Sequence, residues 1–508
     1  MTILFCLQNR NPFYAKLSMS RAANFEFLIP GHFGEANLPL IHGSAPCHNL
    51  DQLLLKQCDS VPQGASDLIQ RLLSDPRSLY LAERRVASRS LISDDARGHA
   101  WTTMGAFGHG FLVSRLAVNS MNLLERIAPK VLVFDSAPHD FQSWVLGKTA
   151  EYLNLLVVLV KQSPLRWRFG YAVGIDTQTW VKSALEQARA PGSDEIEQIE
   201  SLVRLNKDHY EAAEPSYMKR DVGQTLDLRK TPALNENALS WSSFVTQARL
   251  YREARKHQVS DRRYGCWRGA RQKYASLREF HESVSFDQTQ EREERQFAFF
   301  LHHQWERTSL PEGGPYAQQI QAIIWLRQWL PNHVVIVVKE HPVTLSRFTA
   351  NSLRPLGFYS FVSSLPGVKI AHPSVDAFYL IDHCSMVGTL TGTVGFQALC
   401  RRRPVLAFGN ANYLSHPAVF TPTYNVRSYE KIIREYSEDH PAFAFSSLCK
   451  YLGGFCDFTL GWRGLLDDPY SLMSEQWALA ILVTNFAEYW RCEDFRKRIF
   501  QAASEASA

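Results

Sequence analysis

The sequence lacks several features that would assign a 508-residue chain to a common protein class. Its nine cysteines are scattered and odd in number, and no Cys-x-x-Cys pair occurs, so we expect neither a disulfide framework nor a zinc site. No run approaches the roughly 18 apolar residues of a membrane span. The amino terminus has no basic region followed by a long apolar core. These absences favour a cytoplasmic protein without a signal peptide.

A strong charge imbalance is also missing. The formal net charge of +5 is modest for this length, which argues against a general nucleic-acid binder. No Asp-x-Asp motif follows a predicted strand, so we predict no essential metal, and nothing in the sequence indicates a cofactor. The hydrophobic content of 45% is typical of a folded globular protein, and the length allows two or three domains.

The clearest pattern of strands and polar loops in the sequence lies in residues 334–409. The apolar run 334–338 ends in Lys339-Glu340-His341-Pro342, and a second strand-like run, 385–389, ends in a loop that contains Thr391-Gly392-Thr393-Val394-Gly395. Short β-branched runs alternating with helical runs predict βαβ units on a parallel sheet. Ligands of such sheets bind beyond the carboxyl ends of the strands. We therefore interpret the two polar clusters, at consecutive strand ends, as one site.

The residue types of the two clusters suit a phosphate. A Gly/Thr loop that opens a helix offers backbone N–H groups, hydroxyl donors and the positive end of the helix dipole. Lys339 and His341 can donate to the same anion, and Pro342 suits the first turn of the next helix. The alternatives are a plain turn for the glycine loop and a satisfied core residue for the histidine.

Several ordered patches carry a family resemblance. They are Lys339-Glu340-His341-Pro342, Thr391-Gly392-Thr393-Val394-Gly395-Phe396, Pro404-Val405-Leu406-Ala407-Phe408-Gly409, residues 301–308 with Pro311 and Gly313-Gly314, and residues 133–140. This set resembles the bacterial capsule-polysaccharide biosynthesis glycosyltransferases, a group that includes the transferases that use CMP-Kdo. The resemblance covers roughly residues 130–415 and does not identify the sugar.

The resemblance implies an α/β fold of two Rossmann-like lobes, the GT-B architecture, with a helical insertion between them. Its second lobe would bind the donor nucleotide and its first lobe the acceptor. Donor phosphate would lie among Lys339, His341, the Thr391–Gly395 loop and Arg307. Glu340 and Gln397 would hold ribose or sugar hydroxyls. Many GT-B enzymes have a Glu where this sequence has Gln397, and an amide can still bond a hydroxyl.

The first lobe offers the candidate catalytic groups. Residues 131–135 form a predicted buried strand, and Asp135, His139 and Asp140 follow within six residues. Two carboxylates and an imidazole can supply a base or a nucleophile. A helix cap is the competing interpretation, since Asp140 precedes an apolar helical run. We assign Asp140 to the cap, Asp135 to catalysis as base or covalent nucleophile, and His139 as the next candidate.

The rest of the chain is predicted more coarsely. We expect an acceptor-side lobe at 1–175, a helical, basic connector at 176–290, a nucleotide-sugar lobe at 291–430, and carboxyl-terminal helices at 431–508 that cross back to the first lobe. Residues 105–110, rich in glycine, are predicted to form a structural turn, with a substrate-facing loop as the alternative. Residues 249–278 hold ten Lys/Arg against two acids. This segment is either a solvated helical face or a docking surface for an anionic membrane or acidic glycan.

The sequence thus predicts a nucleotide-sugar-dependent glycosyltransferase of surface polysaccharide synthesis, with a glycan or glycolipid acceptor. It would be cytoplasmic, and peripheral at the inner face of the membrane if residues 249–278 dock there. Two alternatives remain open. One is a sugar-nucleotide epimerase or hydrolase on the same fold, and the other is a non-catalytic subunit that binds nucleotide or glycan in a capsule assembly complex.

Overall fold

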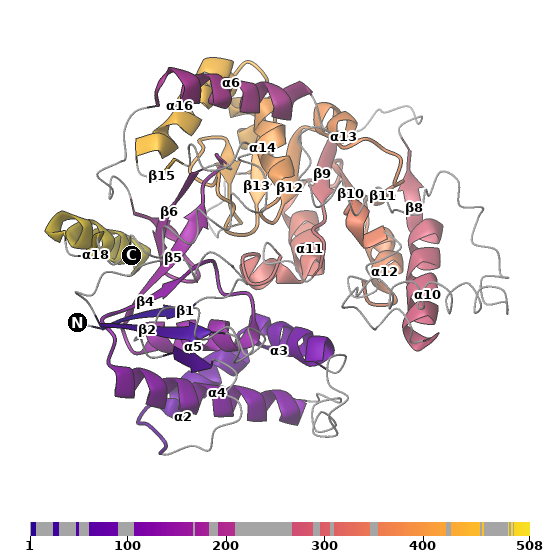
Figure 1. Cartoon of the computed structure of the whole chain (residues 1–508). Coiled ribbons are helices and arrows are strands. Elements are labelled where there is room, and N and C mark those ends of the chain that lie inside the picture. The colour runs from indigo at the N-terminus through magenta and orange to yellow at the C-terminus, as the bar shows by residue number, and fades with distance from the viewer. Residues whose placement is uncertain are drawn as a thin grey trace, which may run out of the picture. The chain divides into compact units, whose positions relative to one another are not determined.

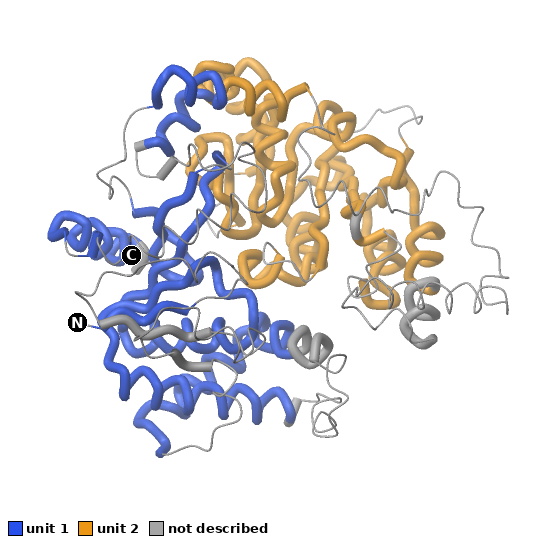
Figure 2. The backbone as a smooth tube through the Cα atoms, viewed as in Figure 1, with its two compact units in different colours: residues 1–199, 449–508 blue, residues 200–448 orange. Residues whose placement is uncertain are grey.

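The computed structural model divides the chain into two compact units, which Figure 2 colours separately. Unit 1 comprises residues 1–199 and 449–508, and unit 2 comprises residues 200–448. The structure describes residues 2–6, 24–29, 47–49, 60–89, 106–165, 168–181, 191–208, 267–287, 295–304, 309–345, 354–422, 428–457, 460–461, 486, 489–490 and 492–507.

Unit 1 is built on one mixed sheet whose order is β15-β6-β5-β4-β1-β2-β3, with β7 paired to β6 (Figure 1). The strands are β1 (Thr2–Cys6), β2 (Asn24–Ile29), β3 (Cys47–Asn49), β4 (Val131–Phe134), β5 (Leu156–Gln162), β6 (Arg168–Val173), β7 (Thr179–Trp180) and β15 (Leu460–Gly461). The helices are α2 (Ala65–Ser74), α3 (Pro76–Arg89), α4 (Ala106–Ile127), α5 (Phe141–Tyr152) and α18 (Glu493–Ser507). Helices α6 (Ser193–Asp208) and α16 (Phe445–Gly453) each contain a division point between the units.

The first five strands of unit 1 are mutually parallel in the order β3-β2-β1-β4-β5. This is the start of the 3-2-1-4-5-6 order of doubly wound sheets, in which ligands bind where the order reverses. In unit 1 the reversal lies between β1 and β4, where Cys6 pairs with Phe134. Asp135 follows Phe134 directly, so it lies at the ligand-binding end of this sheet.

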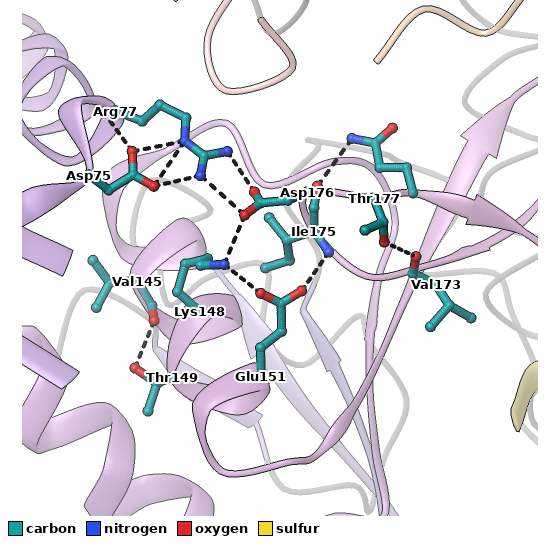
Figure 3. A network of polar contacts seen from close by, with 11 residues as sticks. Asp75, Arg77, Val145, Lys148, Thr149, Glu151, Val173, Ile175, Asp176 and Thr177 are labelled. Carbon is teal, nitrogen blue, oxygen red and sulfur yellow. Dashed lines mark hydrogen bonds and ion pairs between the residues drawn. The ribbon is translucent and has the colours of Figure 1, made fainter. Parts of the chain in front are cut away.

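An ion-pair network ties α3, α5 and the β6–β7 turn together (Figure 3). Arg77 donates to Asp75 and, through Nη1 at 2.6 Å, to Asp176. Lys148 Nζ lies 2.7 Å from Glu151 and 3.0 Å from Asp176. Strand β6 runs antiparallel to β5, so its end lies beside the start of β5. The network therefore belongs to the end of the sheet opposite Asp135.

Unit 2 is built on an all-parallel sheet with the order β14-β13-β12-β9-β10-β11-β8. Its strands are β8 (Val284–Phe286), β9 (Gln296–Phe300), β10 (Val335–Lys339), β11 (Val368–Ala371), β12 (Met386–Thr389), β13 (Val405–Ala407) and β14 (Val419–Phe420). Its α-helices are α10 (Trp267–Ser283), α11 (Gln319–Trp329), α12 (Phe358–Ser364), α13 (Ala377–His383), α14 (Thr393–Cys400) and α15 (Tyr429–Glu435). Its 3-10 turns are η7 (Gly314–Ala317), η8 (Pro342–Leu345) and η10 (Pro441–Phe443).

Alternation along the strands divides the side chains of this sheet between two faces. Phe297, Phe299, Ile336 and Val338 belong to one buried cluster with residues of α10, α11, α12 and α15. Lys339 has the opposite parity to Ile336 and Val338, so it leaves the sheet on the other face. Both faces are buried, which explains why β9 is apolar from Phe297 to Phe300 and β10 from Val335 to Val338.

The expected α/β fold with two Rossmann-like units is confirmed by these topologies. Strands β11-β10-β9-β12-β13-β14 reproduce the full 3-2-1-4-5-6 order, so the switch point of unit 2 lies between β9 and β12. The prediction that the polar ends after 334–338 and 385–389 are consecutive is wrong. Strand β11 separates them in sequence and β9 separates them in space. The loop after β9 therefore lies in the middle of the site.

A second correction concerns residues 105–110. The predicted turn is wrong over its described part, because helix α4 begins at Ala106 and runs through Gly108 and Gly110. A glycine in a helix costs only about 1 kcal/mol. The packing of a long helix outweighs this, since Leu112, Leu116 and others along it are buried.

Candidate functional site

The loop after β9 supplies the residue at the centre of the switch point. His302 is buried, and its ring reaches across to the loop after β12. Nε2 of His302 accepts from the backbone N–H of Thr391 at 3.2 Å and lies 3.0 Å from the hydroxyl of Thr389. A backbone amide can only donate, so Nε2 is the acceptor and the proton of the neutral ring resides on Nδ1. His302 thus joins the ends of β9 and β12.

The loop after β12 leads into helix α14, whose N-cap is Gly392. Glycine has no side chain to accept from the first turn, so these N–H groups and the positive helix end suit an anion. A Cβ on Gly392 would lie 2.9 Å from the Thr389 hydroxyl and 3.0 Å from His302 Nε2. The close packing of this loop on His302 therefore favours glycine at the N-cap.

Strand β10 ends in the second predicted cluster. Lys339 is buried, and its Nζ donates to the carbonyl of Pro373 at 2.9 Å. Glu340 is also buried, and its carboxylate accepts from the backbone N–H of His341 at 2.7 Å and from the Tyr359 hydroxyl at 2.8 Å. Pro342 opens the 3-10 turn η8, as its fixed φ predicts.

The electrostatics of this cluster favour neutral histidines. Burial lowers the pKa of His302 to about 3, and the positive charge of Arg354 adds to the effect. Burial also lowers the pKa of His341 to about 3, with His302, Arg354 and Lys339 contributing. Burial lowers the pKa of Lys339 to about 8, so this amine keeps most of its charge at pH 7. One cation and two neutral imidazoles therefore lie at adjacent strand ends.

The other predicted donor residues occupy several positions. Thr391 and Gly392 are partly exposed and Thr393 is exposed, whereas Gly395 is buried. A Cβ on Gly395 would overlap the hydroxyl of Tyr413, which donates to the Gly392 carbonyl at 2.5 Å. Gly395 therefore leaves room for the Tyr413 hydroxyl to hold the Gly392 carbonyl.

Two further candidates need separate mention. Gln397 is 3% exposed, so its amide lies within the packing of α14. Direct contact of Gln397 or Glu340 with a ribose hydroxyl would require their present surroundings to change on binding. Arg307 lies outside the described residues.

The candidate catalytic residues lie at the switch point of unit 1. Asp135 is fully buried, and its backbone N–H donates to the carbonyl of Cys6 at 3.4 Å. His139 is partly exposed, and its Nδ1 lies 3.3 Å from the Ala137 carbonyl. Asp140 is the N-cap of α5 and accepts from the backbone N–H of Ser143 at 3.0 Å. Burial, and then the charges of Asp140 and Asp135, raise the pKa of the Cys6 thiol.

Sequence reasoning assigned no role to three residues that shape the unit 2 site. His302 lies within residues 301–308, one of the segments that carry the family resemblance, so the sequence did contain a sign that this residue belongs to the site. Gln319 holds the backbone of His302 from both sides, through Oε1 at 2.6 Å and Nε2 at 3.0 Å. Arg354 donates to Glu340 and to the His302 carbonyl. No local pattern marks Gln319 or Arg354, because their partners are distant in sequence.

The described part of the chain contains neither a cluster of metal ligands nor a membrane-spanning helix. Across these residues no group of three or more His, Cys, Asp or Glu side chains could hold a metal ion. Among the residues that the structure covers, no helix has both the length and the apolar character needed to cross a membrane.

Comparison with known proteins supports the family resemblance. Residues 228–416 match the model of the family described as capsule polysaccharide biosynthesis protein, which confirms the resemblance over most of unit 2. A comparison with curated protein sequences finds no match.

Among solved structures, the KpsC β-Kdo 2,7-transferase of Thermosulfurimonas dismutans is 11% identical, with a TM-score of 0.29 over 71% of this chain and 89% of that one. The UDP-GlcNAc 2-epimerase of Methanocaldococcus jannaschii is 10% identical, with a TM-score of 0.20 over 95% and 99%. The glycosyltransferase SnogD of Streptomyces nogalater is 9% identical, with a TM-score of 0.21 over 90% and 96%. At TM-scores this low, these structures indicate nothing about the site.

Proposed function

We propose that this chain is a glycosyltransferase of surface or capsular polysaccharide synthesis. It would move a sugar from a nucleotide donor to a glycan or lipid-linked acceptor, with Kdo from CMP-Kdo as the first donor to test. The observation that carries the proposal is the switch point of unit 2. There, the N-terminus of α14 has no side-chain cap and lies against neutral His302. Strand β10 of the same sheet ends in Lys339 and neutral His341, and all of these residues lie within the segment that matches the capsule family.

In this proposal the donor phosphate binds at the N-terminus of α14. The N–H groups that follow Gly392, the hydroxyls of Thr391 and Thr393, and His341 would donate to it, and Arg307 would join them. Lys339, the last residue of β10, would add positive charge to the site. Negative charge builds on the departing phosphate as the glycosidic bond breaks, and fixed donors aimed at that charge lower the barrier.

The acceptor chemistry is assigned to unit 1. Asp135 would take the proton of the acceptor hydroxyl in an inverting reaction, or attack the sugar carbon in a retaining one. Its place directly after β4, beside the reversal of strand order, supports this assignment. His139 is the second candidate for the same step.

A panel of nucleotide sugars, incubated with and without glycan acceptors, tests the proposed function. A transferase forms a glycosidic product when both donor and acceptor are present. Turnover of donor at the same rate without any acceptor would indicate the epimerase or hydrolase instead. Binding of a nucleotide sugar with no turnover under either condition would indicate a non-catalytic subunit.

The proposed membrane partner requires its own test. Most of the basic segment 249–278 lies outside the described residues, and its last part forms the start of α10. We propose that this segment docks on anionic membrane, because it contains ten Lys and Arg residues and only two acidic residues. Attraction of this kind is screened by salt. Sedimentation with anionic vesicles should therefore fall steeply from low to high salt, and equal binding to neutral vesicles would contradict the proposal.

A further inference from the structure

Arg354 lies between the loops that follow β9 and β10 and uses its whole guanidinium group there. Nε donates to Glu340 Oε2 at 2.9 Å, and Nη2 donates to Glu340 Oε1 at 2.9 Å. The same Nη2 donates to the His302 carbonyl at 2.8 Å, and Nη1 donates to Gln304 Oε1 at 2.6 Å. A planar fork of this kind fixes both the distance and the angle of its partners.

These bonds form a continuous path between the two histidines. Arg354 holds the backbone carbonyl of His302 and the carboxylate of Glu340. The same carboxylate accepts from the backbone N–H of His341. His302 and His341 are therefore joined through two side chains, those of Arg354 and Glu340.

Because Arg354 and Glu340 are buried, their ion pair is expected to add little to the stability of the fold. The side chains of Arg354 and Glu340 are 2% and 1% exposed. A fully buried ion pair gives little net stabilisation, because the loss of hydration offsets the attraction, and well-packed apolar residues often replace such pairs without loss. The directional bonds to two loops are what an apolar pair could not supply. The path therefore points to a role in geometry.

We propose that Arg354 is a positioning residue of the donor site, which holds the loops after β9 and β10 so that His302 and His341 stay fixed at the switch point. The reference to a donor rests on the proposed function, whereas the geometric claim does not. The positive charge of Arg354 acts in the same direction, since it helps to hold the pKa of both histidines low.

A purely structural role is the competing interpretation, and unit 1 offers a matched control for it. Arg168 and Glu195 form a second buried pair, with an Nη2–Oε1 distance of 2.5 Å and side chains 2% and 3% exposed. Replacing only one member of either pair would leave a buried charge and endanger folding. The variants are therefore the double substitutions Arg354→Met with Glu340→Gln, and Arg168→Met with Glu195→Gln. A third variant, Arg354→Lys, retains the charge without the planar fork.

The experiment uses the full chain and two measurements. The first records the ring carbon signals of His302 and His341 by NMR without ligand at one fixed pH, assigned with His302→Gln and His341→Gln. The second measures affinity for CMP by calorimetry. We expect the 354/340 double variant to melt close to the wild type while both ring signals move or broaden and CMP affinity falls about tenfold or more. The 168/195 variant should retain wild-type signals and affinity.

The outcomes separate this inference from the proposed function. If the 354/340 variant folds and keeps both wild-type ring signals, Arg354 does not position the histidines. If the Arg354→Lys variant shows the wild-type ring signals of His302 and His341, charge alone is sufficient and the role of the planar guanidinium group is refuted. If wild-type protein binds neither CMP nor any nucleotide sugar, the proposed function fails, and the ring signals still decide the positioning claim.

Discussion

The two units share a strand order, and the side chains at their switch points differ in chemistry. In unit 1 the strands β1 and β4 meet there, and two carboxylates, Asp135 and Asp140, follow β4. In unit 2 the corresponding strands, β9 and β12, are followed by His302 and the loop that contains Gly392. The first set can accept protons, and the second can donate to an anion.

The helices after β4 and β12 show the same contrast. Asp140 caps α5 with its own carboxylate, so the positive end of that helix already has an anionic partner. Gly392 caps α14 without a side chain, so its helix end can take a ligand instead. The two helices therefore differ at their N-termini: a carboxylate caps α5, and no side chain caps α14. This contrast supports the proposal that phosphate binds in unit 2 and that acid–base chemistry belongs to unit 1.

The largest expected effect tests the unit 1 side of this comparison. As a catalytic group, Asp135 replaced by Asn should lower turnover by about 10²–10⁴ while donor affinity remains nearly intact. As a residue that only orders the turn, its loss should lower the melting temperature and leave turnover of the folded fraction within a few-fold. Turnover, donor affinity and melting temperature measured on one preparation distinguish the two roles. Near-normal turnover of a folded variant would move the assignment to His139.

The next effect tests the unit 2 side, by giving α14 the cap that α5 has. Gly392→Asp would place a carboxylate at the open helix end, where it would repel a phosphate. Its Cβ would also press on Thr389 and His302, so charge and displacement of the loop act in the same direction. We expect donor affinity to fall about ten- to hundredfold, the range that the loss of one charged hydrogen bond of about 1.5–3 kcal/mol represents. Calorimetry with the donor nucleotide measures it, and His341→Ala should change affinity in the same direction. Unchanged binding in both folded variants would place the phosphate elsewhere.

The sequence predicted those parts of both sites that depend on local pattern. The strands predicted at 131–135 and 334–338 are observed with each end within one residue, because apolar runs bounded by polar residues are local signals. The cap at Asp140 is likewise confirmed, since capping depends on adjacent residues.

What the sequence did not reveal depends on contacts between distant residues. The strand order that puts β9 between β10 and β12 cannot be obtained from periodicity, so the central place of His302 was missed. Arg354 follows Glu340 by 14 residues and reaches His302 52 residues before it. The residues around Arg354 in the sequence give no sign of such partners, and its burial becomes visible only when the sheet is assembled.

Acid should remove the contributions of His302 in unit 2 and of Asp176 in unit 1 in different pH ranges. The folded-state pKa of His302 is about 3, below its ordinary value of 6.5, so the unfolded chain binds this proton first. The stability that His302 contributes is complete above about pH 6.5 and is lost as the pH falls toward 3. In the unit 1 network of Figure 3, Arg77 and Lys148 overcome the effect of burial and lower the pKa of Asp176 to about 2, so its contribution is lost only below about pH 4.

Denaturant unfolding at a series of pH values measures this difference. Each pH unit within the titration window of one group changes the free energy of unfolding by at most about 1.4 kcal/mol. His302→Gln should flatten the pH dependence between 6.5 and 4, and Asp176→Asn should flatten only the part below 4. A His302→Gln profile parallel to the wild type over the upper window would show that His302 is protonated normally in the folded chain.

The smallest expected effect asks whether an open helix end is sufficient to make an anion site. Asp140→Ala removes the cap of α5 and should cost about 1 kcal/mol of stability, within the 0.5–2 kcal/mol usual for such caps. It would leave α5 uncapped, as α14 is, yet the surroundings would still differ. Asp135 remains directly after β4, whereas the α14 site has neutral histidines and Lys339. We therefore expect the variant to bind CMP or inorganic phosphate with the wild-type stoichiometry. A second anion site appearing in calorimetry would show that the helix end alone makes the site, and His302 and His341 would then lose their place in the account of donor binding.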